Sequence, residues 1–380
     1  MPHERFAIYN RRRRHCGPGR ILGLARIGRS SLVLEKAHDF SALGAGLQLG
    51  PNAVSALQWL GVWDAVAPHC VAPREIHVRD GITGHILQRV VLGPEFESRL
   101  GAPYRVAHRN DLHNALLQVV HQYPGITLAH NTEVTGVSVT DTTLTINSGK
   151  TLKTRAIIAA DGVNSIVRNS LHGKNGRSSS HTIYRALVPT GSVPQGTDVE
   201  VVTLWLYPGG HVVHYAVSNG ELFNIVASVV EGRATPATAF QRACQPLADL
   251  LNAQKTWTVW PARDVKPKPA WSKNRTLLLG DAAHASLPYL AQGAAMALED
   301  ACELAVAIRN SRDIETAFRN FAKARFARTR DIQIKSRQLG RIYQARGLVR
   351  QARNLFLRRT SPQKFIGRLS WVYDWKMPKE

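Results

Sequence analysis

The segment AIIAADGVNSIVR brings an acidic residue and a glycine to the end of a hydrophobic run. The run Ala156 to Ala160 predicts a buried strand, and Asp161 and Gly162 follow it. A glycine at this point lets the backbone approach a ligand closely, and the helix start that follows offers N–H groups to a phosphate. An Asp-Gly pair after a strand is common, so this segment by itself also fits an ordinary β-turn.

The segment LLLGDAAHASLPYLAQGAAMALEDA is a longer and more ordered pattern. Asp281 ends a predicted buried strand, where its carboxylate can accept hydrogen bonds from a ribose or ribityl hydroxyl. Pro288 shapes the loop that follows, and a helix begins near Gly293. Backbone donors of Gly293 and Ala294 at this helix start can lie against an electron-rich ring edge. The order of these features favours a binding site over an irregular loop.

These segments need strands and helices to position them, and the rest of the chain predicts such elements. SSLVLEK (Ser30 to Lys36) reads as a short buried strand that ends at an acid, and Ile76 to Leu92 reads as a hairpin. Strand–helix units at both ends of the chain, with a β-rich middle, predict a Rossmann-like α/β fold interrupted by a mainly β domain and followed by C-terminal helices. The expected divisions are a discontinuous first domain at 1–180 and 270–325 with hairpin 76–92 inserted, a β-rich substrate domain at 181–269, and a helical segment at 326–380.

Composition indicates the class of protein. With 380 residues, 44% hydrophobic and 20% charged, the chain is long enough for a sizeable globular core. No stretch approaches the ~18 apolar residues of a membrane span, and no apolar core follows the basic N-terminus, so we expect neither membrane insertion nor a secretory signal. The four cysteines are far apart, which argues against zinc or a disulfide framework and favours a cytoplasmic protein with no metal site.

The charge balance is unusual, because 49 Lys and Arg residues against 27 Asp and Glu residues give a formal net charge of +22. Such a balance raises the possibility of nucleic-acid binding. However, the basic residues are spread out, with concentrations only at Arg11 to Arg14 and at Lys323 to Arg359. The second concentration has apolar positions at helical spacing, which favours one or two amphipathic helices with a solvated basic face. An anionic partner or a membrane surface is the alternative, and no nucleic-acid partner is expected.

Taken together, the motifs resemble one enzyme family. The two segments above, with LEKAHDFSALGAGLQLGPNAVSALQWLG, APYRVAHRNDLHNALL and LWLYPGGHVVHYAV, are similar to the class A (single-component) FAD-dependent aromatic monooxygenases. The likeness is greatest to the branch of salicylate hydroxylase and 3-hydroxybenzoate 6-hydroxylase, and it runs from about Gly23 to Ala322. The motifs are specific for the family and much less so for the substrate.

The resemblance implies a set of FAD-binding residues. Glu35 would hold the adenosine ribose hydroxyls, as expected for an acid about 20 residues after a glycine loop. Arg109 would contact the diphosphate and ribityl region. Asp161, with Gly162, would support the diphosphate and nicotinamide docking, and Asp281 would bind the ribityl chain. The isoalloxazine ring would be lined by Pro288 and by the backbone amides of Gly293 and Ala294.

The resemblance also implies the reaction. NADH or NADPH would pass a hydride to the flavin, O2 would form a C4a-hydroperoxide, and its distal oxygen would attack an electron-rich phenolic acid such as salicylate or a hydroxybenzoate. On the middle-domain strand, His214 is the candidate that accepts or relays the phenolic proton, with Tyr215 beside it. Packing within the sheet is the alternative role for both residues. A homodimer is compatible with the sequence.

One departure from the family pattern concerns the first cofactor loop. The family begins with a strand, Gly-x-Gly-x-x-Gly and a helix, whereas FAIYN is followed here by NRRRRHCGPGRILGLAR. The Cβ atoms of Arg11 to Arg14 block both the positive φ and the close approach that a glycine turn provides. The remnant Gly17-Pro18-Gly19 is displaced, and its proline is expected to break the helix start.

A compensated frameshift between about Asn10 and Ala25 offers an explanation. Suitable codons for Arg11 to Arg20, shifted by one base, read Gly-Gly-Gly-Val-Ile-Ala-Gly-Leu-Ala, which restores a glycine loop at the expected distance from Glu35. The nucleotide sequence of this segment tests the hypothesis. Two other hypotheses stand beside the active enzyme: a flavin-poor pseudoenzyme of the same fold, and a basic binding protein on an old flavoenzyme scaffold.

Overall fold

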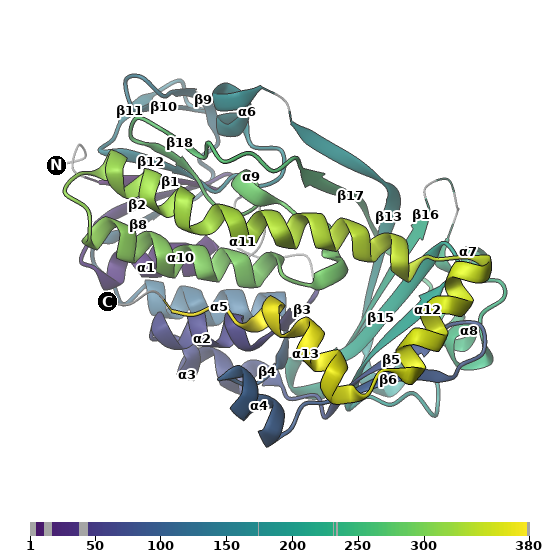
Figure 1. The fold of residues 1–380 in the computed structure, drawn as a ribbon. Helices are drawn as coiled ribbons and strands as arrows, with labels where there is room; N and C mark the ends of the chain where they lie inside the picture. Colours follow the sequence, from purple (N-terminus) through teal and green to yellow (C-terminus); the bar gives the residue numbers. More distant parts are fainter. Residues whose placement is uncertain are drawn as a thin grey trace.

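The computed structural model describes residues 5–10, 17–37, 45–173, 175–230, 232 and 235–377. Within them, a six-stranded sheet has the order β18-β19-β12-β1-β2-β8, and a seven-stranded sheet has the order β17-β13-β16-β15-β14-β5-β6. Figure 1 shows the two sheets at opposite ends of the molecule, with the long helix α11 (Ile314–Tyr343) extending from one to the other. An α/β domain joined to a mainly β region, with C-terminal helices, agrees with the fold predicted from the sequence.

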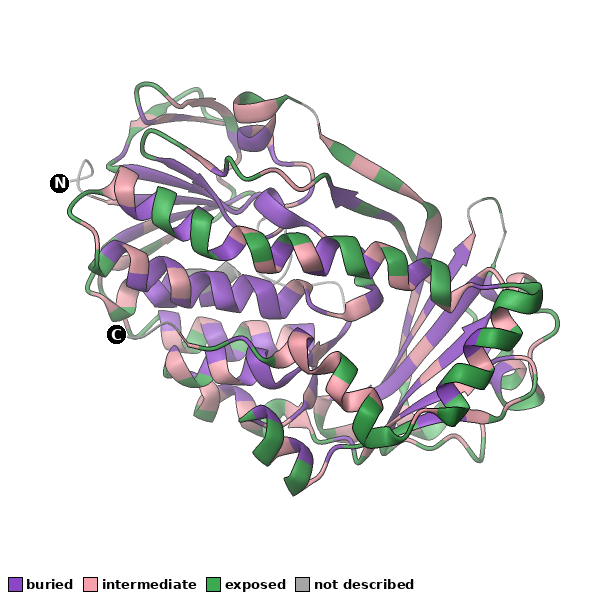
Figure 2. Ribbon diagram, viewed as in Figure 1, coloured by how far each residue is buried: buried purple, intermediate pink, exposed green. Residues whose placement is uncertain are grey.

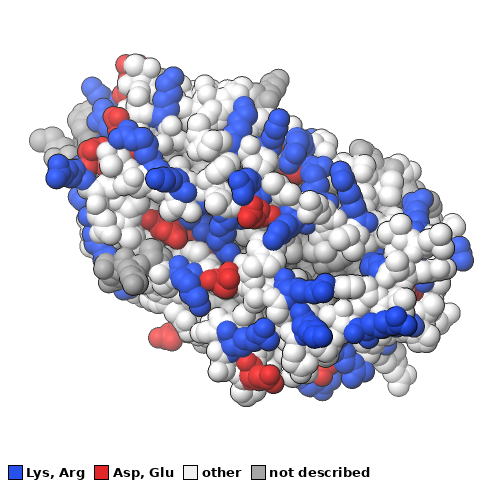
Figure 3. Space-filling view, in the orientation of Figure 1, with Lys and Arg blue, Asp and Glu red and all other residues white. Residues whose placement is uncertain are grey.

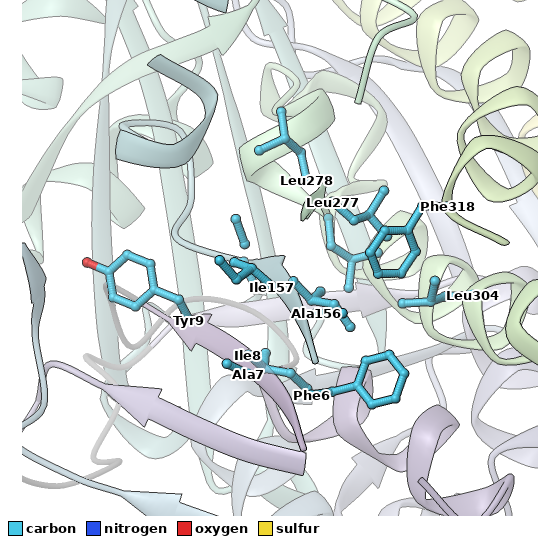
Figure 4. Close-up of a cluster of buried hydrophobic side chains, with 14 of the residues drawn as sticks. Phe6, Ala7, Ile8, Tyr9, Ala156, Ile157, Leu277, Leu278, Leu304 and Phe318 are labelled. Carbon is cyan, nitrogen blue, oxygen red and sulfur yellow. The ribbon is translucent and has the colours of Figure 1, made fainter. Parts of the chain in front are cut away.

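The six-stranded sheet is parallel except at its β18 edge, and its strands are short apolar runs that helices cover. Phe6, Ile157 and Leu277 pack with Leu304 and Phe318 of the covering helices in the core that Figure 4 shows. The strands are β1 (Phe6–Asn10), β2 (Ser31–Glu35), β8 (Ile126–Ala129), β12 (Ala156–Ala159), β18 (Ser272–Lys273) and β19 (Thr276–Leu278).

Helices α1 (Gly17–Arg26) and α10 (Gly293–Arg309) pack closely against each other beside this sheet. Their contact needs a glycine, because a Cβ on Gly23 would collide with the backbone carbonyl of Ala301. The helix α1 includes Pro18 in its first turn, where a missing N–H costs no helical hydrogen bond. The prediction that this proline breaks the helix start is therefore wrong. Arg11 to Arg14, on which the glycine-loop argument turns, lie outside the described residues.

The seven-stranded sheet is antiparallel except where β14 meets β5. The hairpin predicted at 76–92 is confirmed as β5 and β6, and it extends this sheet rather than the six-stranded one. The strands are β5 (Glu75–Asp80), β6 (Ile86–Val91), β13 (Gly176–Pro189), β14 (Val201–Tyr207), β15 (Gly210–Val217), β16 (Leu222–Val230) and β17 (Thr258–Val265).

Smaller elements complete the fold. Figure 2 shows that buried residues run through both sheets and most of α10, whereas α11 alternates between buried and exposed and α12 is mostly exposed. Two three-stranded sheets are formed by β3 (Gly46–Leu49), β7 (Arg105–His108) and β4 (Cys70–Val71), and by β9 (Val134–Ser138), β10 (Thr143–Ile146) and β11 (Thr151–Lys153). The other helices are α2 (Pro51–Trp59), α3 (Trp63–Val66), α4 (Pro94–Leu100), α5 (Arg109–Val120), α6 (Ile166–His172), α7 (Pro236–Ala239), α8 (Gln245–Asn252), α9 (Asp281–His284), α12 (Gly347–Arg359) and α13 (Pro362–Tyr373).

The basic C-terminal segment forms α11 and α12, as its helical spacing predicted, but its arginines are not all solvated. Arg325 is fully buried and pairs with Glu299 and Asp300 at 2.7 and 2.8 Å. Arg337, which is partly exposed, pairs with the buried carboxylate of Asp264 at 2.7 Å. The predicted solvated basic face is thus correct for most of the segment, whose basic side chains are largely exposed, but Arg325 and Arg337 instead tie α11 to both halves of the molecule.

The remaining positive charge is dispersed. Figure 3 shows Lys and Arg side chains scattered over one face of the molecule, with few acidic side chains between them. Among the described helices, none combines the length and apolar character that crossing a membrane requires. The described His, Cys, Asp and Glu residues form no group of three or more that could hold a metal ion.

Candidate active site

Three acids predicted to bind FAD lie at one edge of the six-stranded sheet. The strands β2, β12 and β19 run in the same direction, and they lead into Glu35, Asp161 and Asp281 respectively. Because the carboxyl ends of parallel strands share an edge, the three carboxylates come from one side of the sheet. Glu35 is fully buried, and its Oε1 accepts a hydrogen bond from the backbone N–H of Ala37 at 2.9 Å.

The turn after β12 is built around Asp161. Its Oδ2 accepts a hydrogen bond from the backbone N–H of Ile166 at 2.8 Å, at the start of α6. Burial raises the pKa of Asp161, although the hydroxyl of Ser165 and nearby backbone amides oppose the rise. The following residue, Gly162, has φ of +80°, which a glycine adopts without strain.

Arg168 connects the turn after β12 to the turn after β19 through hydrogen bonds. Its Nη1 donates to the carbonyl of Ala282 at 3.0 Å, and its Nη2 donates to the carbonyl of Val163 at 2.6 Å. The side chain is buried, so these bonds are shielded from water. The turn after β12 and the turn after β19 therefore hold a fixed separation.

The turn around Asp281 is anchored from behind by Asp300. The Oδ2 atom of Asp300 accepts a hydrogen bond from the backbone N–H of Gly280 at 2.9 Å and lies 2.7 Å from His284 Nε2. Although burial opposes its ionisation, His284 and Arg325 hold the pKa of Asp300 well below its usual value. The buried carboxylate is thus charged and fully engaged, and it fixes the backbone that presents Asp281.

A second anchor holds the residue before α10. The side chain of Asn52 donates to Gln292 Oε1 at 2.8 Å, and also to Glu299 Oε1 at 2.6 Å. Because its side-chain oxygen accepts from Asn52, Gln292 makes no side-chain hydrogen bond to the first backbone N–H groups of α10. The helix begins at Gly293, where an added Cβ would meet no atom within 4 Å.

A cavity of about 260 Å³ lies between this edge and one face of the seven-stranded sheet. Its volume exceeds the ~150 Å³ of an engineered cavity that holds a benzene ring. On the cofactor side it is lined by five residues that the sequence singled out: Arg109, Asp281, Pro288, Gly293 and Ala294. On the sheet side its lining includes Ile183, Arg185, His211, Val213, Tyr215, Val226 and Trp260.

The structure does not bring His214 to this cavity. Successive side chains of a strand point to opposite faces, so Tyr215 lines the cavity and His214 points away from it. The indole Nε1 of Trp205 donates to His214 Nε2 at 2.9 Å, and the ring of Phe223 lies 5.2 Å away. Burial lowers the pKa of His214 to about 3, so its imidazole is neutral within an apolar core.

His211 occupies the position that the sequence reasoning gave to His214. It lies four residues before Tyr215, and this even spacing puts both side chains on the cavity face. Its ring packs against Tyr289 and Tyr343, with centroids 5.2 and 5.5 Å away, and burial lowers its pKa to about 3. The even spacing in HVVHY was the available signal, because adjacent residues such as His214 and Tyr215 cannot share a face.

The residues at the sheet edge fit FAD. The Oδ1 atom of Asp161 is buried and, among the described residues, has no hydrogen-bond partner, so it can accept from a ligand. Gly162 and Gly293 leave open space where a side chain would otherwise project, which lets a flat ring or a phosphate approach the backbone. Glu35, Asp161 and Gly162 do not line the cavity itself, which agrees with a dinucleotide that extends beyond the reaction space.

Comparisons with known proteins identify the family of this chain. A family model described as FAD binding domain matches residues 19–311. The 3-hydroxybenzoate 6-hydroxylase of Polaromonas naphthalenivorans (strain CJ2) is 35% identical, over 95% of this chain and 94% of that protein. The 3-hydroxybenzoate 6-hydroxylase of Klebsiella oxytoca is 33% identical, with the same coverage of 95% and 94%.

Solved structures share the fold. Klebsiella pneumoniae HpxO complexed with FAD and uric acid has a TM-score of 0.85 and 23% identity, covering 98% of this chain and 97% of that one. A salicylate hydroxylase substrate complex has a TM-score of 0.81 and 23% identity, covering 99% and 96%.

Proposed function

Since this chain belongs to the FAD binding domain family and is an FAD-dependent monooxygenase, we propose that it hydroxylates a phenolic aromatic acid of the hydroxybenzoate kind, with NADH or NADPH and O2 as co-substrates. The observation that carries the proposal is the cavity in which Asp281 and the start of α10 face His211 and Tyr215. The relatives named above act on 3-hydroxybenzoate, and their similarity extends over nearly the whole chain.

In this proposal the sheet edge holds the cofactor. Glu35 binds the adenosine ribose, Arg109 contacts the diphosphate and ribityl region, Asp161 supports the turn at the diphosphate, and Asp281 binds the ribityl chain. The buried anchors Arg168 and Asp300 keep these turns in place before the cofactor arrives, which reduces the entropy lost on binding. Once bound and reduced, the flavin supplies the activated oxygen.

The sheet face holds the aromatic ring. Val213 and Val226 provide an apolar floor, and His211 is the polar group that meets the phenolic hydroxyl. With its pKa near 3, the imidazole of His211 is neutral at neutral pH, so a ring nitrogen can accept the hydroxyl hydrogen. A hydrogen bond that draws the proton away makes the ring more electron-rich and favours attack by an electrophilic oxygen.

The test is to measure bound flavin by absorbance and then NADH and NADPH oxidation with a panel of hydroxybenzoates. We expect a yellow protein whose nicotinamide oxidation is stimulated by at least one phenolic acid, with a hydroxylated product. A folded protein that retains no flavin after incubation with excess FAD and removal of the free cofactor would contradict the proposal and favour the flavin-poor pseudoenzyme.

A further inference from the structure

We propose that Arg185 binds the carboxylate of the aromatic-acid substrate and thereby selects acids over neutral phenols. This inference rests on the proposed function, which it deepens by naming the group that recognises the acid. Arg185 lies on β13, is half-buried, and lines the cavity from the sheet side.

The strand register puts Arg185 and His211 on one face at a suitable separation. Arg185 pairs with Val226 across β13 and β16, and Val226 pairs with Val213 across β16 and β15. His211 lies two residues before Val213, in the next row of the same face. With strands ~4.8 Å apart and rows ~6.8 Å apart, the Cα atoms of Arg185 and His211 are separated by about 12 Å. An arginine, one benzene ring and an imidazole together bridge that distance.

The floor between these two groups suits a benzene ring. Val226 lies between Arg185 and Val213 in one row of this face, His211 lies in the next row, and both valines line the cavity. A ring on this floor can direct a carboxylate to Arg185 and a hydroxyl to His211 at the same time. A meta arrangement of the two substituents fits such a two-point contact better than an ortho arrangement, because the polar groups lie on different strands.

The charges around the cavity favour an anionic ligand at Arg185. Three arginines line the cavity, and Asp281 is the acid among its described lining residues. Arg109 lies on the cofactor side, and Arg263 is exposed and donates from Nη1 to Asn164 Oδ1 at 3.3 Å. Arg185 instead lines the cavity from the sheet, near Tyr215. Burial raises the pKa of Tyr215, and the positive charge of Arg185 opposes that rise. A guanidinium can hold a carboxylate through two parallel hydrogen bonds.

The experiment compares two ligands with matched variants of the FAD-loaded enzyme. Dissociation constants for 3-hydroxybenzoate and for 3-hydroxybenzamide, its uncharged analogue, are measured by calorimetry for wild type and Arg185→Met. We expect Arg185→Met to weaken binding of the acid roughly 100-fold, since a charge-assisted bidentate pair is lost, and to leave the amide within about 3-fold. Arg185→Lys keeps the positive charge but cannot form two parallel hydrogen bonds, so its loss of affinity for the acid should be intermediate.

Arg263→Met is the matched control, because it removes the same charge from the same cavity at an exposed position. It should change the ratio of acid to amide affinity by less than about 3-fold, as expected for a screened charge. Steady-state kinetics provide a second readout: Arg185→Met should raise KM for the acid far more than it lowers kcat.

Four results would overturn the inference. Equal loss of acid and amide binding in Arg185→Met would make Arg185 a packing residue, and an equal change in Arg263→Met would make the effect one of overall charge. Arg185→Met could instead keep its preference for the acid while wild type still hydroxylates 3-hydroxybenzoate. That result would refute carboxylate binding by Arg185 and leave the proposed function unaffected. A wild-type holoenzyme that binds neither ligand and hydroxylates no aromatic acid would contradict the proposed function together with this inference.

Discussion

The edge of the six-stranded sheet and the cavity face of the seven-stranded sheet contribute to one site by different structural means. At the edge, Asp161 and Asp281 lie in turns after parallel strands, and buried partners such as Arg168 and Asp300 hold the turns from behind. On the face, His211 and Tyr215 owe their position to the alternation of side chains along β15. Their support comes from ring packing and the sheet itself.

This difference separates two kinds of function. A ligand at the edge is held by backbone turns and carboxylates, so the edge should determine whether FAD binds. A ligand on the face meets side chains from several neighbouring strands, so the face should determine which ring is bound and how it reacts. Substitutions in the two regions should therefore affect different measurements.

The largest effect is expected at the edge, from Asp281→Ala. If the Asp281 carboxylate accepts two hydrogen bonds from ribityl hydroxyls, as proposed, each worth ~1.5–3 kcal/mol with a charged acceptor, its loss should weaken FAD binding on the order of a thousand-fold. Flavin absorbance per protein and titration of the apoprotein measure the change. Asp141→Ala, in the exposed β9–β10 turn, is the control and should retain its flavin. Normal FAD affinity in Asp281→Ala would remove the edge carboxylate from cofactor binding.

On the cavity face, His211→Gln should slow hydroxylation on the order of tenfold without loss of FAD, because a neutral imidazole of low pKa acts through a hydrogen bond to the phenol. The deficit should shrink at high pH, where the phenol ionises without help. Product formation and nicotinamide oxidation are followed together, because a misplaced ring lets reducing equivalents escape as peroxide. A flavin-loaded His211→Gln enzyme with wild-type product formation would contradict the role of this face.

The smallest catalytic effect is expected on the opposite face of the same strand. His214→Ala leaves the Trp205 indole N–H buried without its acceptor, so we expect a loss of about 1–3 kcal/mol in the free energy of unfolding at pH 7. Hydroxylation by the folded enzyme should stay within about 3-fold of wild type, because the residue lies outside the cavity. A large loss of turnover in a stable His214→Ala enzyme would restore the sequence-based assignment.

Acid titration sharpens the contrast further. The pKa of His214 is about 3 in the folded chain, below the ~6.5 of a free histidine, so protonation of the unfolded chain lowers the free energy of unfolding as the pH falls through 6.5. Between pH 7 and pH 5, this single group should lower the free energy of unfolding of the wild-type protein by about 2 kcal/mol. His214→Ala lacks that loss, so its stability deficit should narrow at pH 5. A constant deficit in denaturant melts at both pH values would contradict a buried neutral imidazole.

The edge could be predicted from sequence because its signals are local. Each acid follows a short apolar strand, and parallel order then brings Glu35, Asp161 and Asp281 to one side. Hairpin 76–92 was equally local, but its attachment to the second sheet depends on the long-range pairing of β5 with β14. The ion pairs of Arg325 and Arg337 are also long-range, so the basic segment looked more solvated than it is.

The face could be predicted only in part, because it depends on register. The segment HVVHY identifies a strand with two histidines, yet only one of them can point to the same face of the strand as Tyr215. Arg185 lies about 25 residues before His211 in the chain and reaches the cavity through the pairing of β13, β16 and β15. No local pattern around Arg185 signals that position.

The most direct test of the account is to follow oxygen from isotopically labelled O2 with the purified FAD-loaded protein, NADH or NADPH, and 3-hydroxybenzoate. The account predicts one labelled oxygen atom in each molecule of hydroxylated acid, formation of that product by His214→Ala, and loss of most of it in His211→Gln. Nicotinamide oxidation that yields only peroxide, with no labelled oxygen in any hydroxybenzoate tested, would contradict it.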